Sequence, residues 1–329
     1  MRRLPMKTAG LIDSVLSSAE FVVRPPVLVD VGASGGIHAS WKPIARYSIC
    51  IGFDPDDREF STAGGNRGFR ECHVVKAIVT DRDSANSTVY LTKSPYCSST
   101  LRPRLDQLAK YAHAGLFAVV GTTTVPSARL ETVLANFGID SVDWLKTDSQ
   151  GLDRRVFESL SPELRKRTMV VELEPGIMDG YDGEDKLEDI LDVFAGTDFW
   201  CASLLAKGAV RGSAKVLERH LGPAMLSSLS TTEKIGAGWV EIEFINAFDN
   251  PKLHTARDLL LGWVLATLRG HHAFAIEVAD TGNELFPDDL RFRQLLENSA
   301  AGIMMRHRTG LIRRGLRKLS RVVFGNSNT

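Results

Sequence analysis

The amino-acid sequence predicts an α/β fold with a doubly wound, mostly parallel sheet, and two observations carry this prediction. Short apolar runs alternate with stretches of helical spacing, as they do where helices connect parallel strands. Polar residues gather directly after three of these runs, at 30–36, at Asp54 and at 148–151. Because such a sheet binds ligands beyond the carboxyl ends of its strands, these positions predict one shared site.

In the first half of the chain the elements follow one another clearly. Leu11 to Val23 has apolar residues at roughly helical spacing, and Arg24-Pro25-Pro26 ends this helix. Further helices are expected near 37–45 and over 154–160. The expected strands of this half are 27–31, 48–53, 73–79, 88–92, 142–146 and 168–173.

The second half is less regular. Apolar spacing predicts helices over 184–194 and 253–268, and a third over 211–229 that Gly222-Pro223 interrupts. Residues 199–206 and the alternating run 239–244 are expected as strands. We therefore expect an N-terminal helical segment at 1–26, a sheet domain at 27–250, a C-terminal helical extension at 251–305 and a basic tail at 306–329.

The composition narrows the class of protein. Apolar residues make up 43% of the chain, enough for a full core, and the 40 basic and 40 acidic residues balance, which predicts no nucleic-acid partner. The four sparse cysteines lack Cys-x-x-Cys spacing and an accompanying His cluster, so we expect no metal site and a reducing compartment. No signal peptide is recognised, and the longest apolar stretch reaches about half a membrane span, which predicts a cytoplasmic location.

A glycine-rich loop follows the strand at 27–31. It reads Gly32-Ala33-Ser34-Gly35-Gly36, and glycines at such a turn let a ligand approach the backbone closely. Asp54 follows about 20 residues on, after the next strand, where a carboxylate accepts hydrogen bonds from a ribose diol. Strand, loop, strand and acid in this order predict a nucleotide-type binding site.

The loop sequence favours one of two ligand classes. Dinucleotides require Gly-x-Gly-x-x-Gly, so that their pyrophosphate can sit on a helix N-terminus, and this loop has a different spacing. Asp30 directly before the loop disfavours an anion and suits the amino group and sulfonium of S-adenosylmethionine. A methyl donor is therefore expected, with an NAD-dependent oxidoreductase or a non-catalytic binding module as the alternatives.

Several segments between residues 27 and 175 together resemble the FkbM family of methyltransferases in order and spacing. The most specific of them contains Lys146-Thr147-Asp148-Ser149-Gln150-Gly151. The resemblance implies a Rossmann-like, seven-stranded sheet and methylation of a hydroxyl, often on a sugar of a surface glycan or a secondary metabolite. The matching segments are 29–36, 52–55, 75–81, 94–101 and 143–151.

The resemblance also implies roles for individual residues. The loop commonly carries Asn where Ser34 stands and Glu where Asp54 stands, and both replacements keep the hydrogen-bonding capacity. The implied cofactor-binding residues are Asp30, Gly32, Ala33, Ser34 and Gly36 at the methionine end, Asp54 at the ribose, Ala77 within the 76–81 turn at the adenine, and Ser99, with Ser98, near the cofactor or acceptor.

Lys146 and Asp148 would face the reacting centre. Methyl transfer from a sulfonium is an in-line displacement, and a free hydroxyl is a poor nucleophile, so a base within hydrogen-bond reach helps. We expect Asp148 to be this base or to orient the acceptor, and Lys146 to tune its charge. The structural alternatives are a helix cap for Asp148 and a plain salt bridge for Lys146. His38 and His73 are expected to be structural.

The C-terminal tail is strongly basic. No acidic residue occurs after Glu297, and a helix would place Ile312, Leu316, Leu319 and Val323 on one face. Such a helix can lie on an anionic membrane surface, so peripheral contact at the inner face of the membrane is expected beside a small-molecule or glycan acceptor. A solvated or docked helix, or a disordered tail, is the alternative.

Overall fold

The computed structural model describes residues 5–32, 38–53, 68–226, 228–250 and 253–323, with side chains described as far as residue 308. The chain divides into two compact units. One comprises Arg24–Ala247 and holds both sheets. The other combines Met1–Val23 with Phe248–Thr329 and is helical.

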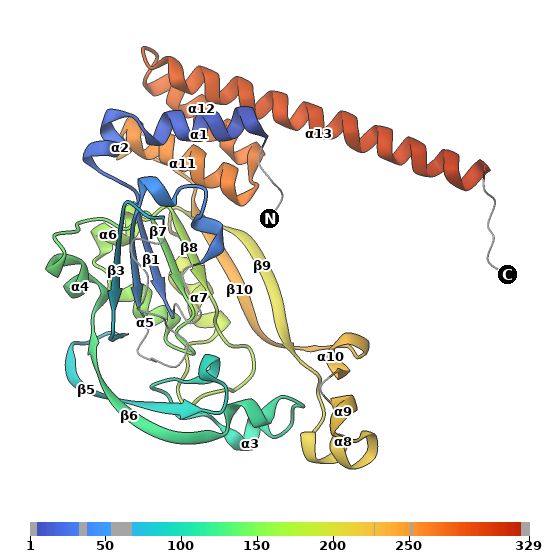
Figure 1. The fold of residues 1–329 in the computed structure, drawn as a ribbon. Coiled ribbons are helices and arrows are strands. Elements are labelled where there is room, and N and C mark those ends of the chain that lie inside the picture. Colours follow the sequence, from blue (N-terminus) through green and yellow to red (C-terminus); the bar gives the residue numbers. More distant parts are fainter. Residues whose placement is uncertain (1–4, 33–37, 54–67, 227, 251–252, 324–329) are drawn as a thin grey trace. The chain divides into compact units, whose positions relative to one another are not determined.

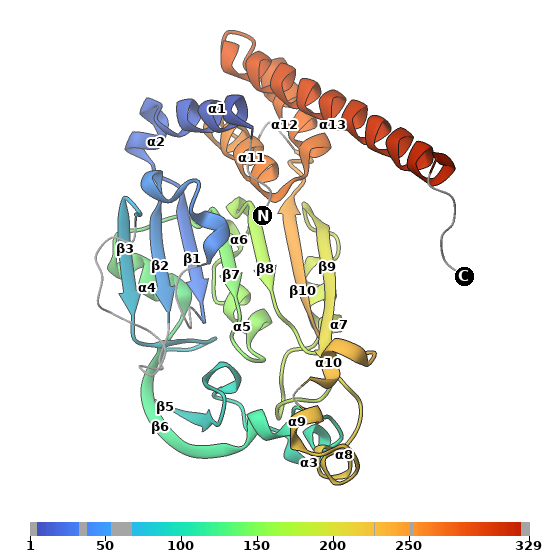
Figure 2. The same ribbon diagram turned by 45° about the vertical axis from the view of Figure 1, so that its right-hand side comes forward.

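The larger unit is built on a seven-stranded sheet, shown in Figure 2. All neighbouring strands run parallel except where β10 pairs antiparallel with β8 and β9. This confirms the predicted mostly parallel, seven-stranded Rossmann-like sheet. In spatial order the strands are β3 (Glu71–Val75), β2 (Ile49–Phe53), β1 (Val27–Val31), β7 (Trp144–Thr147), β8 (Val170–Leu173), β10 (Gly236–Asn246) and β9 (Phe199–Ala209).

Four helices pack their apolar sides on one face of this sheet. They bury the outward-pointing valines and leucines of β1, β7 and β8 in one core. Phe194 stacks on Phe244 at a ring-centroid distance of 3.8 Å and on Phe157 at 4.9 Å, which ties helix to strand. The helices are α4 (Leu130–Asn136), α5 (Asp153–Glu158), α6 (Pro162–Arg167) and α7 (Leu187–Phe194).

The opposite face of the central strands carries Trp144, Asp30 and Lys146, because side chains alternate along a strand. Trp144 is fully buried there against Trp41, at 5.8 Å between ring centroids. Trp41 belongs to a 3-10 turn, Ala39–Trp41, which a second turn, Ala45–Tyr47, follows. The predicted helix near 37–45 is therefore wrong for its described part, which forms short 3-10 turns.

A second, three-stranded sheet lies beyond the carboxyl ends of the main strands, as Figure 1 shows. It has the order β4 (Ile78–Val79), β6 (Val119–Ala128) and β5 (Ser84–Thr92). The single strand predicted at 73–79 is wrong, because the chain breaks at Lys76-Ala77 and enters this other sheet. The ten-residue strand β6 was not predicted. Between β5 and β6 lie the turn Pro95–Cys97, α3 (Leu105–Leu108) and the turn Ala114–Phe117.

Three short helices connect the long antiparallel strands β9 and β10. They are α8 (Ala214–Leu221), α9 (Pro223–Leu226) and α10 (Leu229–Thr232). Gly222 has a φ of 78°, so the chain turns between α8 and α9 where the sequence predicts the interruption.

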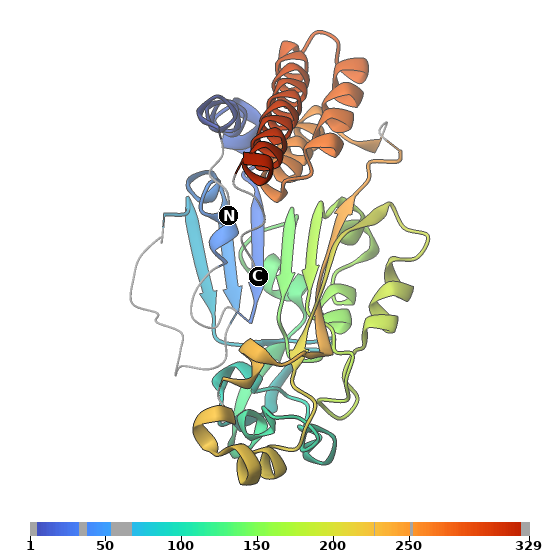
Figure 3. The ribbon, with the colours of Figure 1, turned by 90° about the vertical axis from the view of Figure 1, so that its right-hand side faces the viewer.

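The helical unit contains α1 (Met6–Leu16), α2 (Ala19–Val23), α11 (Ala256–Arg269), α12 (His272–Leu285) and α13 (Leu290–Val323). Figure 3 shows α11 to α13, in orange and red, packed beside one another. The buried indole N–H of Trp263 donates to Ser299 Oγ at 2.9 Å, joining α11 to α13. The helix expected over 11–23 is in fact two helices. Within the described residues no helix is long and apolar enough to span a membrane.

Candidate functional site

The strands β1 and β7 meet at the point where the order of the sheet changes direction. Val31 pairs with Thr147, and the backbone N–H of Asp148 donates to the carbonyl of Val31 at 2.9 Å. Gly32 follows with a φ of +81° and donates to the carbonyl of Phe53 at 3.0 Å. A Cβ at this position would lie 2.2 Å from the carbonyl oxygen of Asp148, so only glycine fits.

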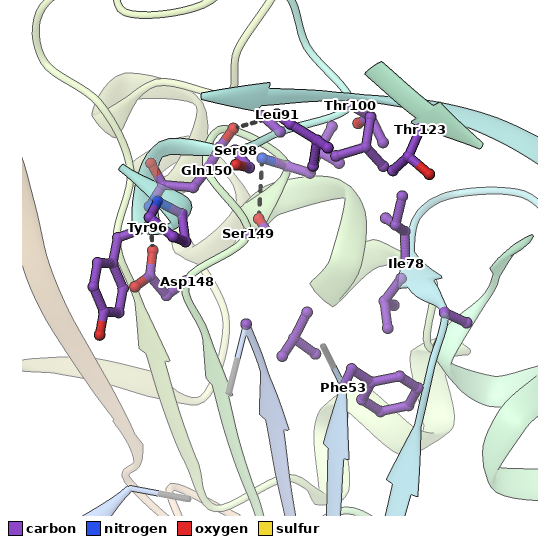
Figure 4. Close-up of a pocket in the computed structure, with 18 residues that line it drawn as sticks. Phe53, Ile78, Leu91, Tyr96, Ser98, Thr100, Thr123, Asp148, Ser149 and Gln150 are labelled. Atoms are coloured by element: carbon purple, nitrogen blue, oxygen red, sulfur yellow. Dashed lines mark hydrogen bonds between the residues drawn. The ribbon is translucent and has the colours of Figure 1, made fainter. Parts of the chain in front are cut away.

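A pocket opens directly beyond this meeting point, and we call it the first pocket. It encloses about 760 Å³, part of it open to solvent. Of the residues singled out in the sequence, it brings together Gly32, Ala77, Ser98, Ser99 and Asp148. Figure 4 shows Phe53 and Ile78 across the pocket from Asp148. Ala33, Ser34, Gly36 and Asp54, also predicted here, lie outside the described residues.

Asp30 and Lys146 form an ion pair across β1 and β7. Their Oδ1 and Nζ atoms are 3.6 Å apart, and both side chains are largely buried. The other carboxylate oxygen of Asp30 accepts from the backbone N–H of His38 at 3.0 Å. On its other side Lys146 pairs in register with Glu172 of β8. The predicted salt-bridge alternative for Lys146 is thus present in the structure.

Lys146 is held in its charged form. Burial works to lower its pKa, but the carboxyl groups of Asp30, Asp148, Glu174 and Glu172 together raise the pKa above its ordinary value. The ammonium group of Lys146 is therefore the counter-charge to a cluster of four acids at the centre of the sheet.

Asp148 lies half-buried at the end of β7 and lines the first pocket. Burial raises the pKa of its carboxyl to about 6, with Asp153 and Asp30 adding to the effect, while Lys146 and a hydrogen bond from Gln150 oppose it. The structure contradicts the alternative that Asp148 caps the following helix. The N-cap residue of α5 is Leu152, whose N–H donates to Ser149 Oγ at 3.1 Å. The Asp148 side chain lines the pocket instead.

Gln150 and Tyr181 fix the orientation of the Asp148 carboxylate. The Gln150 side-chain amide donates to Asp148 Oδ1 at 2.5 Å, and its carbonyl oxygen accepts from the Tyr181 hydroxyl at 2.9 Å. Gln150 has a φ of +54°, an unusual conformation for a residue other than glycine. Ser99 supports this turn, since its hydroxyl donates to the Gln150 backbone carbonyl at 2.8 Å. Ser99 thus acts through the backbone of Gln150.

A second pocket lies on the other side of Asp148. It encloses about 940 Å³, part of it open, and shares Tyr96, Asp148 and Gln150 with the first pocket. Its remaining wall includes Glu174 and Trp239. The sequence analysis did not identify Glu174, Trp239, Tyr181 or Gln150 as site residues. Gln150 stands within the quoted 143–151 segment, which was the available signal for it.

Glu174 follows β8 and also belongs to the acid cluster. Burial raises the pKa of its carboxyl to about 8, and the charges of Asp148, Asp153 and Glu241 add to this, against the opposing effect of Lys146. Of the two acids, Glu174 therefore has the higher pKa and holds a proton more readily than Asp148.

The two histidines near the site have structural contacts. His38 Nδ1 lies 2.5 Å from Ser40 Oγ, and the His73 ring lies against Phe137 at a centroid distance of 4.3 Å. Across the described ranges, no three His, Cys, Asp or Glu side chains are grouped as a metal site would require.

The fold and the pocket together define the class of open α/β proteins whose ligands bind beyond the carboxyl ends of the central strands, here β1, β2 and β7. Residues 46–199 match the family model of the methyltransferase FkbM domain. This match confirms the resemblance of this part of the chain to the FkbM methyltransferases that the sequence predicts. A comparison with curated proteins gives no match.

Replacing Gly32 by Ala should destabilise the larger unit by about 2–4 kcal/mol, the sum of a strained φ and a forced backbone shift. The added Cβ meets the carbonyl oxygen of Asp148, which cannot rotate away. Urea unfolding followed by tryptophan fluorescence measures the loss. Gly138→Ala is the matched control, because Gly138 has a φ of +68° but open space around it. Equal losses for both variants would contradict the close approach of Gly32 to β7.

Replacing Lys146 by Met should destabilise the protein by about 3–5 kcal/mol at pH 8, because it leaves Asp30 as an uncompensated buried charge. The loss should be smaller at pH 5, where Asp148 is protonated and fewer negative charges remain. Thermal unfolding at both pH values measures it. Lys207→Met removes an exposed ion pair with Glu241 and should change stability by about 0–1 kcal/mol at either pH.

Proposed function

We propose that this protein is an S-adenosylmethionine-dependent O-methyltransferase. The observation that carries the proposal is the position of Asp148, which lines both the first and the second pocket. The first pocket would hold the methyl donor and the second the hydroxyl-bearing acceptor. The methyl group would move from one pocket to the other where they meet. A side chain that lines both pockets can remove the proton of the acceptor hydroxyl at that point.

The residues of the first pocket fit S-adenosylmethionine. Gly32 lines this pocket with its backbone, so no side chain separates a ligand from the carboxyl end of β1. Asp30 does not line the pocket; it is buried two residues before Gly32 in its ion pair with Lys146, and it would act on the positive charge of the donor only from there. Phe53, Ala77 and Ile78 form an apolar wall suited to a flat purine ring. The predicted roles of Ser34 and Asp54 remain predictions.

S-adenosylmethionine supplies a methyl group made electrophilic by a positively charged sulfur. Asp148 then accepts the proton of the acceptor hydroxyl as the oxygen–methyl bond forms and the methyl–sulfur bond breaks, with that bonding pair remaining on sulfur. Gln150 and Tyr181 hold the carboxylate in place, so its geometry is set before the acceptor binds. Lys146 limits the rise of the Asp148 pKa and keeps this base ionised at neutral pH.

The acceptor that we propose is a hydroxyl of a sugar in a surface glycan or of a secondary metabolite, as the FkbM resemblance implies. The family match supports methyl transfer over the NAD-dependent oxidoreductase. Asp148, ionised and facing both pockets, supports catalysis over a non-catalytic binding module.

Asp148→Asn should lower the rate of methyl transfer about 10²–10⁴-fold, because the amide cannot accept the proton. Binding of S-adenosylhomocysteine should stay within a few-fold of wild type. The measurements are incorporation of labelled methyl into a glycan extract and calorimetry with S-adenosylhomocysteine.

Asp192→Asn, a substitution at an exposed position of α7, serves as the control and should leave the rate unchanged. Wild-type turnover in Asp148→Asn would remove Asp148 as the base. Thermal stabilisation by NAD, with none by S-adenosylhomocysteine, would instead support the oxidoreductase.

We also propose that the basic tail contacts an anionic membrane surface. Helix α13 continues through Val323, so the stretch with Arg313, Arg314, Arg317 and Lys318 is helical. Each basic residue near such a surface contributes about 1 kcal/mol of attraction. A lipid-linked glycan acceptor would be presented to the enzyme at this surface.

Changing these four residues to Gln in the full chain should reduce flotation with phosphatidylserine-containing liposomes at least tenfold. Neutral liposomes should bind neither protein. The matched control changes the exposed residues Arg167, Lys215, Arg219 and Lys234 to Gln, which removes the same charge elsewhere. If both variants float equally well, the tail is not the membrane contact.

A further inference from the structure

The carboxyl groups of Asp148 and Glu174 occupy equivalent positions on neighbouring strands. Lys146 of β7 pairs in register with Glu172 of β8, and both acids follow two residues later. Side chains two residues apart on a strand point to the same side, so Asp148 and Glu174 follow on the face that carries Lys146. Both line the second pocket, and of the two acids Asp148 alone also lines the first pocket.

Glu174 differs from Asp148 and Glu184, the other two acids of this pocket, in having no partner among the described residues. Glu184 accepts from Lys186 Nζ at 2.9 Å and from the backbone N–H of Gly180 at 2.6 Å. Within the described ranges, no hydrogen bond or ion pair is made by the Glu174 carboxyl. A half-buried carboxyl without a protein partner at the wall of a pocket is accessible to water or to a ligand.

The lining of the second pocket also has a definite charge. Asp148, Glu174 and Glu184 contribute acids, and none of its described lining residues is lysine or arginine. A phosphate or carboxylate entering this pocket would lose its hydration without gaining a cationic partner. Trp239, Phe117 and Tyr181 supply apolar surface beside the acids.

We propose that Glu174 binds the acceptor beside Asp148, and that the two acids restrict the second pocket to acceptor groups carrying neither phosphate nor carboxylate. The inference rests on the proposed function, because it names the substrate class of the same site. Glu174 would donate a hydrogen bond to an oxygen of the acceptor, and Asp148 would take the proton of the reacting hydroxyl. The two carboxyl groups thus divide binding and proton removal between them.

The protonation of the cluster supports this division. The charged groups that face Glu174 are Asp148 and Lys146 from β7, Asp153 from α5 and Glu241 from β10. Burial and the three acids raise its pKa to about 8, so Glu174 keeps the proton that it donates, while Asp148 has released its own above about pH 6. Activity is therefore expected between these two values, falling on the acid side with Asp148 and on the alkaline side with Glu174.

The first experiment compares the pH dependence of methyl transfer into a glycan extract for wild type, Glu174→Gln and Glu174→Ala. Glutamine keeps a donor and cannot ionise, so Glu174→Gln should retain activity at pH 7 and lose the decline above about pH 8. Glu174→Ala should raise KM about tenfold, the effect of one lost hydrogen bond, with a smaller change in kcat. A structural role alone would not remove the alkaline decline in one variant and raise KM in the other.

Glu241→Gln is the matched control. Glu241 also acts on Glu174 electrostatically but lines neither pocket, and it pairs with Lys207 at 3.0 Å. This variant should keep the alkaline decline. An unchanged alkaline decline in Glu174→Gln would overturn the role of Glu174.

The second experiment tests the acceptor class. The labelled product is hydrolysed under mild conditions to its monomers and passed over an anion exchanger. The labelled monomer should pass through unretained, and retention of the label would overturn the proposed selectivity. If wild-type protein binds S-adenosylhomocysteine but transfers no methyl group to the extract, the proposed glycan acceptor and this inference are both overturned. If the protein does not bind S-adenosylhomocysteine either, the proposed function itself is overturned.

Discussion

The arrangement of charge around Lys146 governs the rest of the site. This residue is the one cation among four carboxyl groups that act on it, and it lies closest to Asp30, the most buried of them. Its charge is largely committed to that pair, so it compensates Asp148 and Glu174 only in part. Burial then raises the pKa of Asp148 to about 6 and that of Glu174 to about 8. The described cluster has fewer positive than negative groups. The difference in pKa between Glu174 and Asp148, on which the proposed proton removal depends, follows from this imbalance.

The close contact of β1 with β7 places this charge cluster between two pockets. Gly32 lies against the Asp148 carbonyl, so the glycine turn and the end of β7 form one wall. The first pocket lies on the Gly32 side, and the second is reached past Gln150 and Glu174. Because the chain leaves β1 and β7 toward opposite halves of the sheet, the wall stands where ligands have room on both sides. A larger residue at Gly32 would separate the strands and disturb both pockets.

The sequence predicted the strands that build this wall, and it missed what lies around them. The strand 27–31, its glycine turn and the acid after β7 were predictable, because a buried apolar run ending in polar residues is a local pattern. The split of 73–79 between two sheets was not, because the pairing partners of β4 lie some fifty residues away in β6. Glu174 carries no local signal either: its role depends on the register of β8 with β7 and on the charge of neighbours distant in the chain.

The second sheet and the segment that it holds contribute residues to both pockets. Strands β5 and β6 hold the segment with Tyr96, Ser98 and Ser99 above the strand ends, and Tyr96 lines both pockets. Ser99 reaches the Gln150 backbone and Tyr181 reaches its side chain, so this roof also determines the orientation of Asp148. The first pocket is lined by the ends of β1, β2 and β7 together with this roof, whereas the second also takes in the ends of β8 and β10. Changes at the ends of β8 and β10 could therefore alter the proposed acceptor without touching the first pocket.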